Sequence, residues 1–220
     1  MKTVVASVAA LFIAATAFGQ MKSKDIEKLS EAATVLGELR GAAEGGIPES
    51  ILNKAYCVVV IPDLKKAGFI VAGEHGSGVM SCRHGNTWSA PVFMDMTKGS
   101  AGFQIGVQSI DLVLVVMNKS GAEKLLSNKV TLGADASIAA GPVGRAASAG
   151  TDAQLSAEIL SYSRTKGLFA GVDLSGGSLN PDHSKNERAY GANVSARDIA
   201  LGTAKVKMAP EAQAFINALG

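Results

Sequence analysis

The chain has 220 residues and a net charge of +2, and 47% of its residues are hydrophobic whereas 18% are charged. This length suits one domain with a sizeable core, and the hydrophobic content excludes a disordered chain. The near-neutral charge and the 5% aromatic content argue against a nucleic-acid-binding surface, which needs a basic stripe or aromatic stacking residues.

The first residues have the pattern of a secretory signal. Lys2 precedes an uncharged, mostly apolar run that ends at Gly19, with small residues suited to cleavage before Gln20. A cut two residues earlier is an alternative, and so is an uncleaved anchor, although the run is shorter than the roughly 20 residues of a membrane span. We therefore predict a signal peptide over residues 1–19, a periplasmic or secreted protein, and one mature domain over residues 20–220.

Export affects how the two cysteines are interpreted. Cys57 and Cys82 each lie in a short apolar run, and in an oxidising compartment two cysteines can form a disulfide. Two buried, unpaired cysteines that act as small hydrophobic residues are the commoner outcome. The sequence leaves both alternatives open, because the spacing does not fix the distance between the two Cβ atoms.

Helices are predicted near both ends of the mature chain. From Ser23 to Ala43 the apolar residues recur at three- and four-residue steps, which is typical of an amphipathic helix. A short helix is predicted over Pro48–Lys54, where proline occupies the first turn, and another over Ser120–Ser127. A further short helical stretch is predicted to end near Tyr190. The tail Pro210–Leu219 has the apolar face of a C-terminal helix.

Short β-branched or apolar runs between these helices predict the strands of a mostly antiparallel sheet or barrel. The segment Gly73–Gly78 resembles a phosphate loop, but a strand-like segment follows it instead of a helix, so we interpret it as a hairpin turn. The predicted fold class is α+β, a barrel-like core with helices packed on its surface. The predicted strands are Tyr56–Ile61, Phe69–Ala72, Val79–Cys82, Trp88–Met94, Gly102–Gln108, Leu112–Met117, Ser137–Ala140, Ala157–Ser163 and Leu168–Leu174.

Residues suited to catalysis or metal binding are few. His75, Cys82 and His84 are zinc-binding residue types, but their spacing matches no standard zinc pattern and a fourth ligand is missing. The segment Asp182–Ser184 contains the residue types of a catalytic triad, yet adjacent side chains seldom satisfy triad geometry. We therefore expect no enzymatic activity, no metal and no cofactor.

Basic residues in predicted turns are the candidate ligand-binding groups. Lysine and arginine side chains can bind phosphate groups, arginine through its planar fork. Ordinary solvated turn charge is the alternative interpretation. The candidates are Lys65, Lys66, Arg145, Arg164 and Lys166.

An ordered set of motifs resembles the SYLF domain family. The motifs extend from Lys24 to the C-terminus, and their order is more specific than any one of them. They include Ile47-Pro48, Val60-Ile61-Pro62, Gly76-x-Gly78, Arg83, Trp88-Ser89-x-Pro91-x-Phe93, Gly141-Pro142-x-Gly144-Arg145, Tyr162-Ser163, Lys166–Gly171, Asn186 and Tyr190-Gly191.

The resemblance implies a non-enzymatic, lipid-binding domain with a β-barrel core and surface helices. It implies anionic phospholipids, with phosphoinositides as the family's ligands, as partners of an exported bacterial-type member peripheral on an envelope membrane. Binding through the basic residues would be weak and salt-dependent, because the mature chain would carry a charge of only +1. Fungal members also bind actin, which we do not expect of an exported chain. The alternative is a structural or protein-interaction module of the cell envelope.

Overall fold

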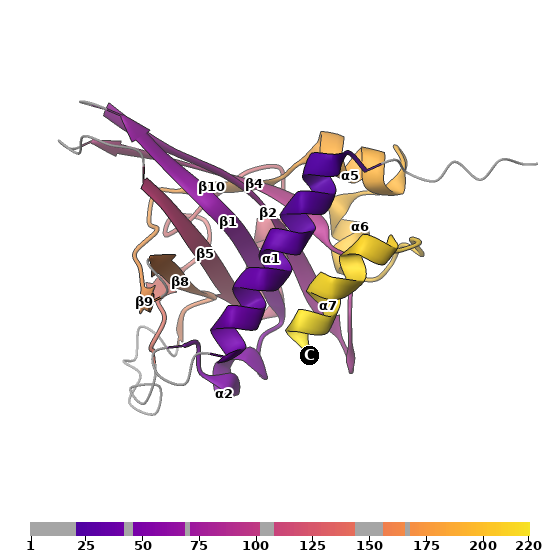
Figure 1. Ribbon diagram of the computed structural model, residues 1–220, viewed down its shortest axis with the longest axis horizontal. Coiled ribbons are helices and arrows are strands. Elements are labelled where there is room, and N and C mark those ends of the chain that lie inside the picture. Colours follow the sequence, from indigo (N-terminus) through magenta and orange to yellow (C-terminus); the bar gives the residue numbers. More distant parts are fainter. Residues whose placement is uncertain (1–20, 42–45, 69–70, 102–107, 144–155, 166–167) are drawn as a thin grey trace, which may run out of the picture.

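A ten-stranded sheet forms the centre of the computed structural model, which describes residues 21–41, 46–68, 71–101, 108–143, 156–165 and 168–220 (Figure 1). The strands are β1 (Cys57–Gly68), β2 (Val71–His84), β3 (Thr87–Trp88), β4 (Val92–Ala101), β5 (Gln108–Val116), β6 (Val130–Thr131), β7 (Ile138–Ala140), β8 (Ile159–Thr165), β9 (Leu168–Gly171) and β10 (Ser178–Pro181). The helices are α1 (Ser23–Gly41), α2 (Glu49–Leu52), α3 (Lys119–Leu125), α5 (His183–Tyr190), α6 (Ala196–Ala200) and α7 (Gln213–Leu219), and η2 (Pro210–Ala212) is a 3-10 turn.

The strands follow the order β6-β10-β4-β2-β1-β5-β8-β7, with β3 paired to β2 and β9 paired to β8. Every pairing between these strands is antiparallel except that of β7 with β8. The sheet curls into a half-barrel, with α1 lying across one face (Figure 1). The predicted α+β class, a barrel-like and mostly antiparallel core with helices on its surface, is confirmed.

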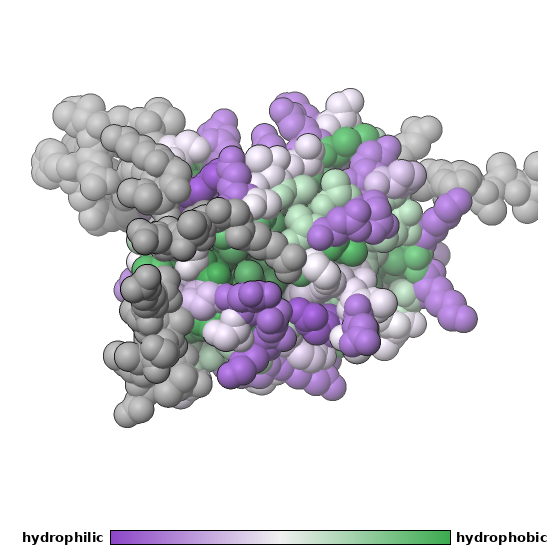
Figure 2. Space-filling view, turned by 60° about the horizontal axis from the view of Figure 1, so that its bottom comes forward, coloured by the Kyte–Doolittle hydropathy of each residue, from purple (hydrophilic) through white to green (hydrophobic). Residues whose placement is uncertain are grey.

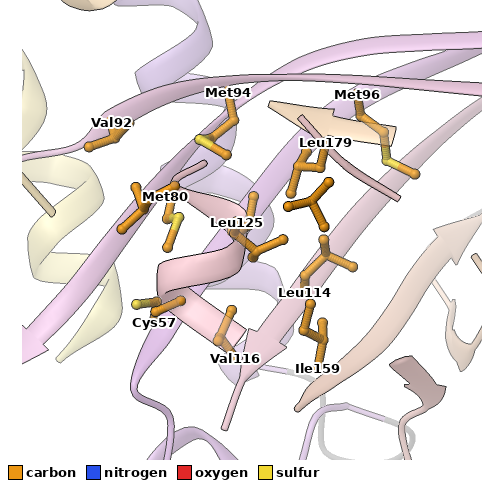
Figure 3. Close-up of a cluster of buried hydrophobic side chains, with 14 of the residues drawn as sticks. Cys57, Met80, Val92, Met94, Met96, Leu114, Val116, Leu125, Ile159 and Leu179 are labelled. Atoms are coloured by element: carbon orange, nitrogen blue, oxygen red, sulfur yellow. The ribbon is translucent and has the colours of Figure 1, made fainter. Parts of the chain in front are cut away.

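The central strand β1 is buried on both faces. Val58 and Val60 pack with the apolar residues of α1 and α7, whereas Val59 and Ile61 belong to a second cluster on the opposite face. In that second cluster Leu125 of α3 lies among side chains of the sheet (Figure 3). Because helices cover both faces, the run Cys57–Ile61 shows no alternation of apolar and polar residues.

A bulge interrupts β1 at Pro62 and Asp63. Between Val60 and Lys65 the strand contains one residue more than the matching part of β2, and its pairing with β5 shifts at the same place. Asp63 has a φ of 54°, and proline has no N–H to donate to a ladder, so both residues suit a bulge better than a regular central strand.

Glycines of β2 lie against this bulge. A Cβ at Gly78 would lie 2.0 Å from the carbonyl oxygen of Val60, and one at Gly76 would lie 2.7 Å from side-chain atoms of Ile61 and Leu64. The prediction of a hairpin turn over Gly73–Gly78 is therefore wrong. These glycines lie inside one long strand, and at Gly76 and Gly78 the close approach of β1 leaves no room for a side chain.

The other predicted elements agree with the structure or differ from it only locally. The helices predicted at both ends are confirmed as α1 and α7. Strand β10 and helix α6 lie in segments without a predicted element. The predicted signal peptide and most of the predicted strand Gly102–Gln108 lie outside the described residues. Within the described part of the chain, no helix has the length and apolar character needed to cross a membrane.

Candidate functional site

Of the basic residues expected to bind phosphate, the two whose side chains the structure describes, Lys65 and Arg164, are paired with carboxylates of the same chain. Lys65 lies within β1 rather than in a turn, and its Nζ is 3.4 Å from Asp63 Oδ2. Hydrogen bonds from Ser109 and Lys65, together with the Lys65 charge, hold the pKa of Asp63 below its ordinary value. The side chain of Lys66 and all of Arg145 and Lys166 lie outside the described residues.

Arg164 is bound to carboxylates on two neighbouring elements. Its Nε and Nη2 donate to Asp111 Oδ2 at 2.9 and 2.5 Å, and it also pairs with Glu38 of α1. Asp111 in turn accepts a hydrogen bond from the backbone N–H of Asp63 at 3.0 Å. This cluster therefore links β8 to the bulge and to α1. The Arg164 guanidinium already has carboxylate partners within the chain.

Replacing Arg164 with alanine should destabilise the fold by about 2 kcal/mol, because the half-buried charge of Asp111 would lose its cationic partner and keep only the hydrogen bond from the Asp63 N–H. The matched change Lys65→Ala should alter stability by less than about 0.5 kcal/mol, because its side chain is 65% exposed and its ion pair is long. Urea unfolding of both variants measures the difference. Equal effects of the two substitutions would contradict the structural role of Arg164.

Asn186 and Tyr190, both members of the motif set, fasten α5 to β4. The side-chain amide of Asn186 accepts from the Phe93 N–H at 2.8 Å and donates to the Phe93 carbonyl at 2.9 Å. The hydroxyl of Tyr190 donates to the Pro91 carbonyl at 2.5 Å, and burial raises the pKa of this phenol. These residues position α5 against β4.

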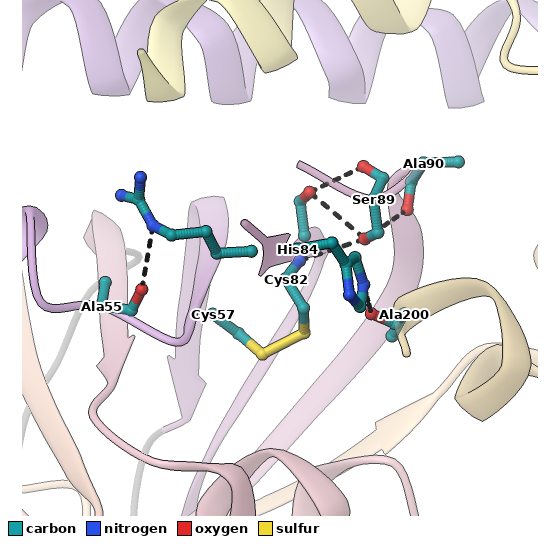
Figure 4. The surroundings of a disulfide bond; sticks show 9 residues. Ala55, Cys57, Cys82, His84, Ser89, Ala90 and Ala200 are labelled. Atoms are coloured by element: carbon teal, nitrogen blue, oxygen red, sulfur yellow. Dashed lines mark hydrogen bonds between the residues drawn. A yellow bond between two sulfur atoms is a disulfide. The ribbon is translucent and has the colours of Figure 1, made fainter. Parts of the chain in front are cut away.

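Cys57 and Cys82 form a disulfide between the paired strands β1 and β2 (Figure 4). Cys82 therefore offers no thiolate to a metal, and His84 lies apart in its own contact, with Nε2 2.8 Å from the Ala200 carbonyl oxygen. Within the described ranges, no group of three or more histidine, cysteine, aspartate or glutamate side chains is arranged to hold a metal ion. Beside the disulfide, the Arg83 guanidinium lies 4.4 Å from the ring centre of Trp88, a cation–π contact.

A carboxylate that the sequence analysis missed, Glu158, joins α3 to the start of β8. It accepts from Lys124 Nζ at 2.7 Å, from Ser120 Oγ at 2.7 Å and from the Ser137 N–H at 3.0 Å. Burial acts to raise the pKa of Glu158, but the hydrogen bonds from Lys124 and Ser120 outweigh it and lower the pKa to about 2. The pKa of Asp182 is also lowered to about 2. Burial acts to raise this pKa, but the hydrogen bonds and the positive charge of Lys185 outweigh the effect of burial.

We expect acid to destabilise the protein through these two carboxylates. Their pKa values are about 2 in the folded state, against ordinary values of 4.5 and 3.8. Their contribution is complete above the unfolded pKa values and is lost as the pH falls from about 5 to about 2. In urea unfolding at several pH values, Glu158→Gln should lower stability at neutral pH and flatten this acid dependence. The exposed control Glu211→Gln should do neither, and an equally steep dependence in Glu158→Gln would contradict the assignment.

A hollow of about 450 Å³ lies between α3, β10, α5 and α6. Its floor is buried or half-buried and mostly apolar, and its rim is exposed and polar. We call this site the α5–α6 hollow. The floor comprises Leu126, Pro181, Asn186, Val194 and Ala196, and the rim comprises Asn128, His183, Glu187, Ala192, Asn193, Ser195 and Arg197. The sequence analysis missed it because its residues come from separate segments that only the fold brings together.

A family model described as "Ysc84: Las17-binding protein actin regulator" matches residues 97–220. The chain belongs to this family. The resemblance to the SYLF family, which is the same family under its domain name, is confirmed. The matched region contains the whole α5–α6 hollow.

The proteins similar to this chain include members of the Ysc84 family from fungi and animals. "LAS seventeen-binding protein 3" of Saccharomyces cerevisiae is 38% identical over 165 residues, which cover 73% of this chain and 36% of the relative. "Protein YSC84" of the same yeast is 36% identical over 182 residues, 80% of this chain and 38% of the relative. "SH3 domain-containing YSC84-like protein 1" of Homo sapiens is 32% identical over 158 residues, 71% of this chain and 46% of the relative. The chain therefore spans less than half the length of these relatives.

The prediction of anionic phospholipids as partners is wrong. One relative is named for binding a protein, and the family description is that of a Las17-binding actin regulator; both names refer to protein partners of those proteins and neither refers to a phospholipid. Of the basic residues on which that prediction relied, the two described side chains, Lys65 and Arg164, are paired with carboxylates of the same chain. On the face seen in Figure 2, hydrophilic residues are spread widely instead of forming one patch.

Proposed function

We propose that this chain is a non-enzymatic protein-interaction domain. The observation that carries the proposal is the Ysc84 family match, together with relatives that are named for binding a protein. The described carboxylates with strongly lowered pKa values support it, because Glu158 and Asp182 are held in internal ion pairs. Such structural networks shift pKa values without serving catalysis.

The test uses the proteins that the family description suggests as probes. The full chain is titrated with purified Las17 by isothermal calorimetry and is sedimented with actin filaments, with serum albumin as the control protein. We expect saturable binding to at least one of the two probes and none to albumin. Absence of saturable binding to both probes at micromolar concentrations would overturn the proposal.

We also propose that the chain is exported. The signal-like pattern of residues 1–19 supports this proposal, and so does a disulfide, because disulfides persist in oxidising compartments. Mass spectrometry of the protein isolated from its own cells should find a mature N-terminus near Gln20 and no free thiol. An intact Met1 together with two free thiols would contradict export.

A further inference from the structure

We infer that the α5–α6 hollow binds an extended peptide segment of a protein partner, which inserts one large apolar side chain and places a basic residue beside Glu187. The inference rests on the proposed protein-binding function and gives that function a location. It follows from the shape of the hollow, from the polar groups on its rim, from the rigidity of its walls and from its charge.

The floor of the hollow suits an apolar side chain. Leu126 at the end of α3 is 7% exposed, Ala196 at the start of α6 is 6% exposed, and Pro181 is buried. The volume of about 450 Å³ lies within the range of roughly 300–1,000 Å³ that is usual for ligand-binding clefts. An apolar floor inside a polar rim is also the common arrangement around an anchor residue in a protein interface.

The rim has polar groups that the fold does not use. Among the residues that the structure describes, the side chains of Asn128, His183, Glu187 and Asn193 form no hydrogen bond or ion pair within the chain. Asparagine offers both donors and acceptors, so Asn128 and Asn193 can bind the N–H and C=O groups of a peptide backbone. In contrast, Lys65 and Arg164, the described members of the basic set, have carboxylate partners in the chain.

Hydrogen bonds within the chain hold α5 and α6, which form two walls of the hollow. Asn186 binds the N–H and the carbonyl of Phe93, and Tyr190 donates to the carbonyl of Pro91, so both residues hold α5 against β4. Ser195 caps α6 by accepting from the Asp198 N–H at 3.0 Å. A preformed site binds with a smaller loss of conformational entropy than one that must be ordered.

The charge of the rim favours a basic ligand. Arg197 Nη2 is 2.7 Å from Glu123 Oε1, an oxygen that also lies 3.9 Å from Lys119 Nζ, so Arg197 has an ion-pair partner within the chain. Glu187 is exposed and has no partner among the described residues, and it therefore supplies the unbalanced charge. Electrostatic complementarity across an interface sets specificity, so the ligand should carry lysine or arginine next to its apolar anchor.

The test begins with a random peptide library that is selected on the full chain, followed by fluorescence anisotropy with the best peptide. The variant Ala192→Trp places a bulky side chain on the rim, and Ala214→Trp on α7 is the matched control, because both alanines are exposed and only Ala192 lines the hollow. We expect selected peptides with an apolar residue next to a basic one. Ala192→Trp should weaken their binding at least about tenfold, and Ala214→Trp should change it less than about twofold.

The variant Glu187→Gln tests the charge. It should weaken binding of the basic peptide several-fold and reduce the salt dependence of its affinity, because a screened ion pair is removed. Far-UV circular dichroism and urea unfolding confirm that each variant is folded. An affinity that Glu187→Gln leaves unchanged would overturn the requirement for a basic residue.

Two further outcomes separate this inference from the proposed function. If peptides or Las17 bind the chain and Ala192→Trp leaves their affinity unchanged, the hollow is not the site, while the protein-interaction function stands. If no peptide is selected and Ala192→Trp instead abolishes self-association in analytical ultracentrifugation, the hollow is a contact between two copies of the chain and the inference is wrong. Failure of every peptide and protein probe would overturn both.

Discussion

Replacing Gly78 with alanine is expected to destabilise the protein by about 3 kcal/mol. The added Cβ would lie 2.0 Å from the backbone oxygen of Val60 and 2.7 Å from the Cα of Ile61. Backbone atoms of the bulged central strand cannot move aside as the end of a flexible side chain can. The two strands must therefore separate, and overpacking of this kind costs about 1–3 kcal/mol or more. Urea unfolding followed by circular dichroism measures the loss.

Gly73 on the same strand provides the control. No atom lies within 4 Å of the position that its Cβ would take, so Gly73→Ala meets no obstacle. It should leave stability unchanged or raise it by about 0.5 kcal/mol, because alanine has less conformational freedom in the unfolded chain. If both substitutions gave the same loss, a general weakness of β2 would explain it and the close approach of β1 would not.

Removing the disulfide with Cys57→Ala and Cys82→Ala together should cost about 3.5 kcal/mol. The bond closes a loop with a sequence separation of 25 residues, and the entropy lost by the unfolded chain on closing a loop of this size gives that magnitude. The denaturation midpoint of the double variant, compared with that of the unmodified chain without reductant, measures the effect. An unchanged midpoint would contradict a stabilising role for the bond.

A single variant gives an independent check of the same bond. Cys57→Ala leaves Cys82 as a lone thiol, and this residue is 0% exposed. A thiol reagent should therefore react with Cys82 only when the protein unfolds, and in the unmodified chain it should find no thiol even in denaturant. Rapid labelling of the folded variant would show that Cys82 is accessible, contrary to its burial.

Elements that depend on local pattern were predictable from the sequence. The steps between apolar residues in α1 and α7 mark helices because each of these helices turns one apolar face to the sheet. The core of β1 was predictable because a strand covered on both faces needs an unbroken apolar run. The three glycines of the segment Gly73–Gly78 misled the interpretation, because a glycine in a turn looks the same in sequence as a glycine packed against a bulged strand, as Gly76 and Gly78 are.

The site was less predictable than the fold. Arg164 was identified as a basic residue, but its partners Glu38 and Asp111 come from distant parts of the chain, and only the folded structure shows that its charge is balanced. Asn186 was found through motif order, whereas its bonds to the backbone of Phe93 follow from the packing of α5 on β4. Apart from Asn186, the residues of the α5–α6 hollow belong to none of the motifs, so no local signal marks them as a site.

The bulge in β1 also determines how the chain tolerates insertions and deletions. Before Pro62 the odd-numbered residues Val59 and Ile61 belong to the cluster beneath α3, whereas after Asp63 the even-numbered Leu64 does so. Deleting either Pro62 or Asp63 would place Leu64 two positions after Ile61 and so restore strict alternation with Leu64 still facing the interior. The side chains beyond the bulge would keep their faces, and only the irregular pairing at the bulge would be lost. One residue added to or removed from the regular run Cys57–Ile61 would instead exchange the two faces of the strand. Relatives should therefore vary in the length of β1 at the bulge rather than within that run.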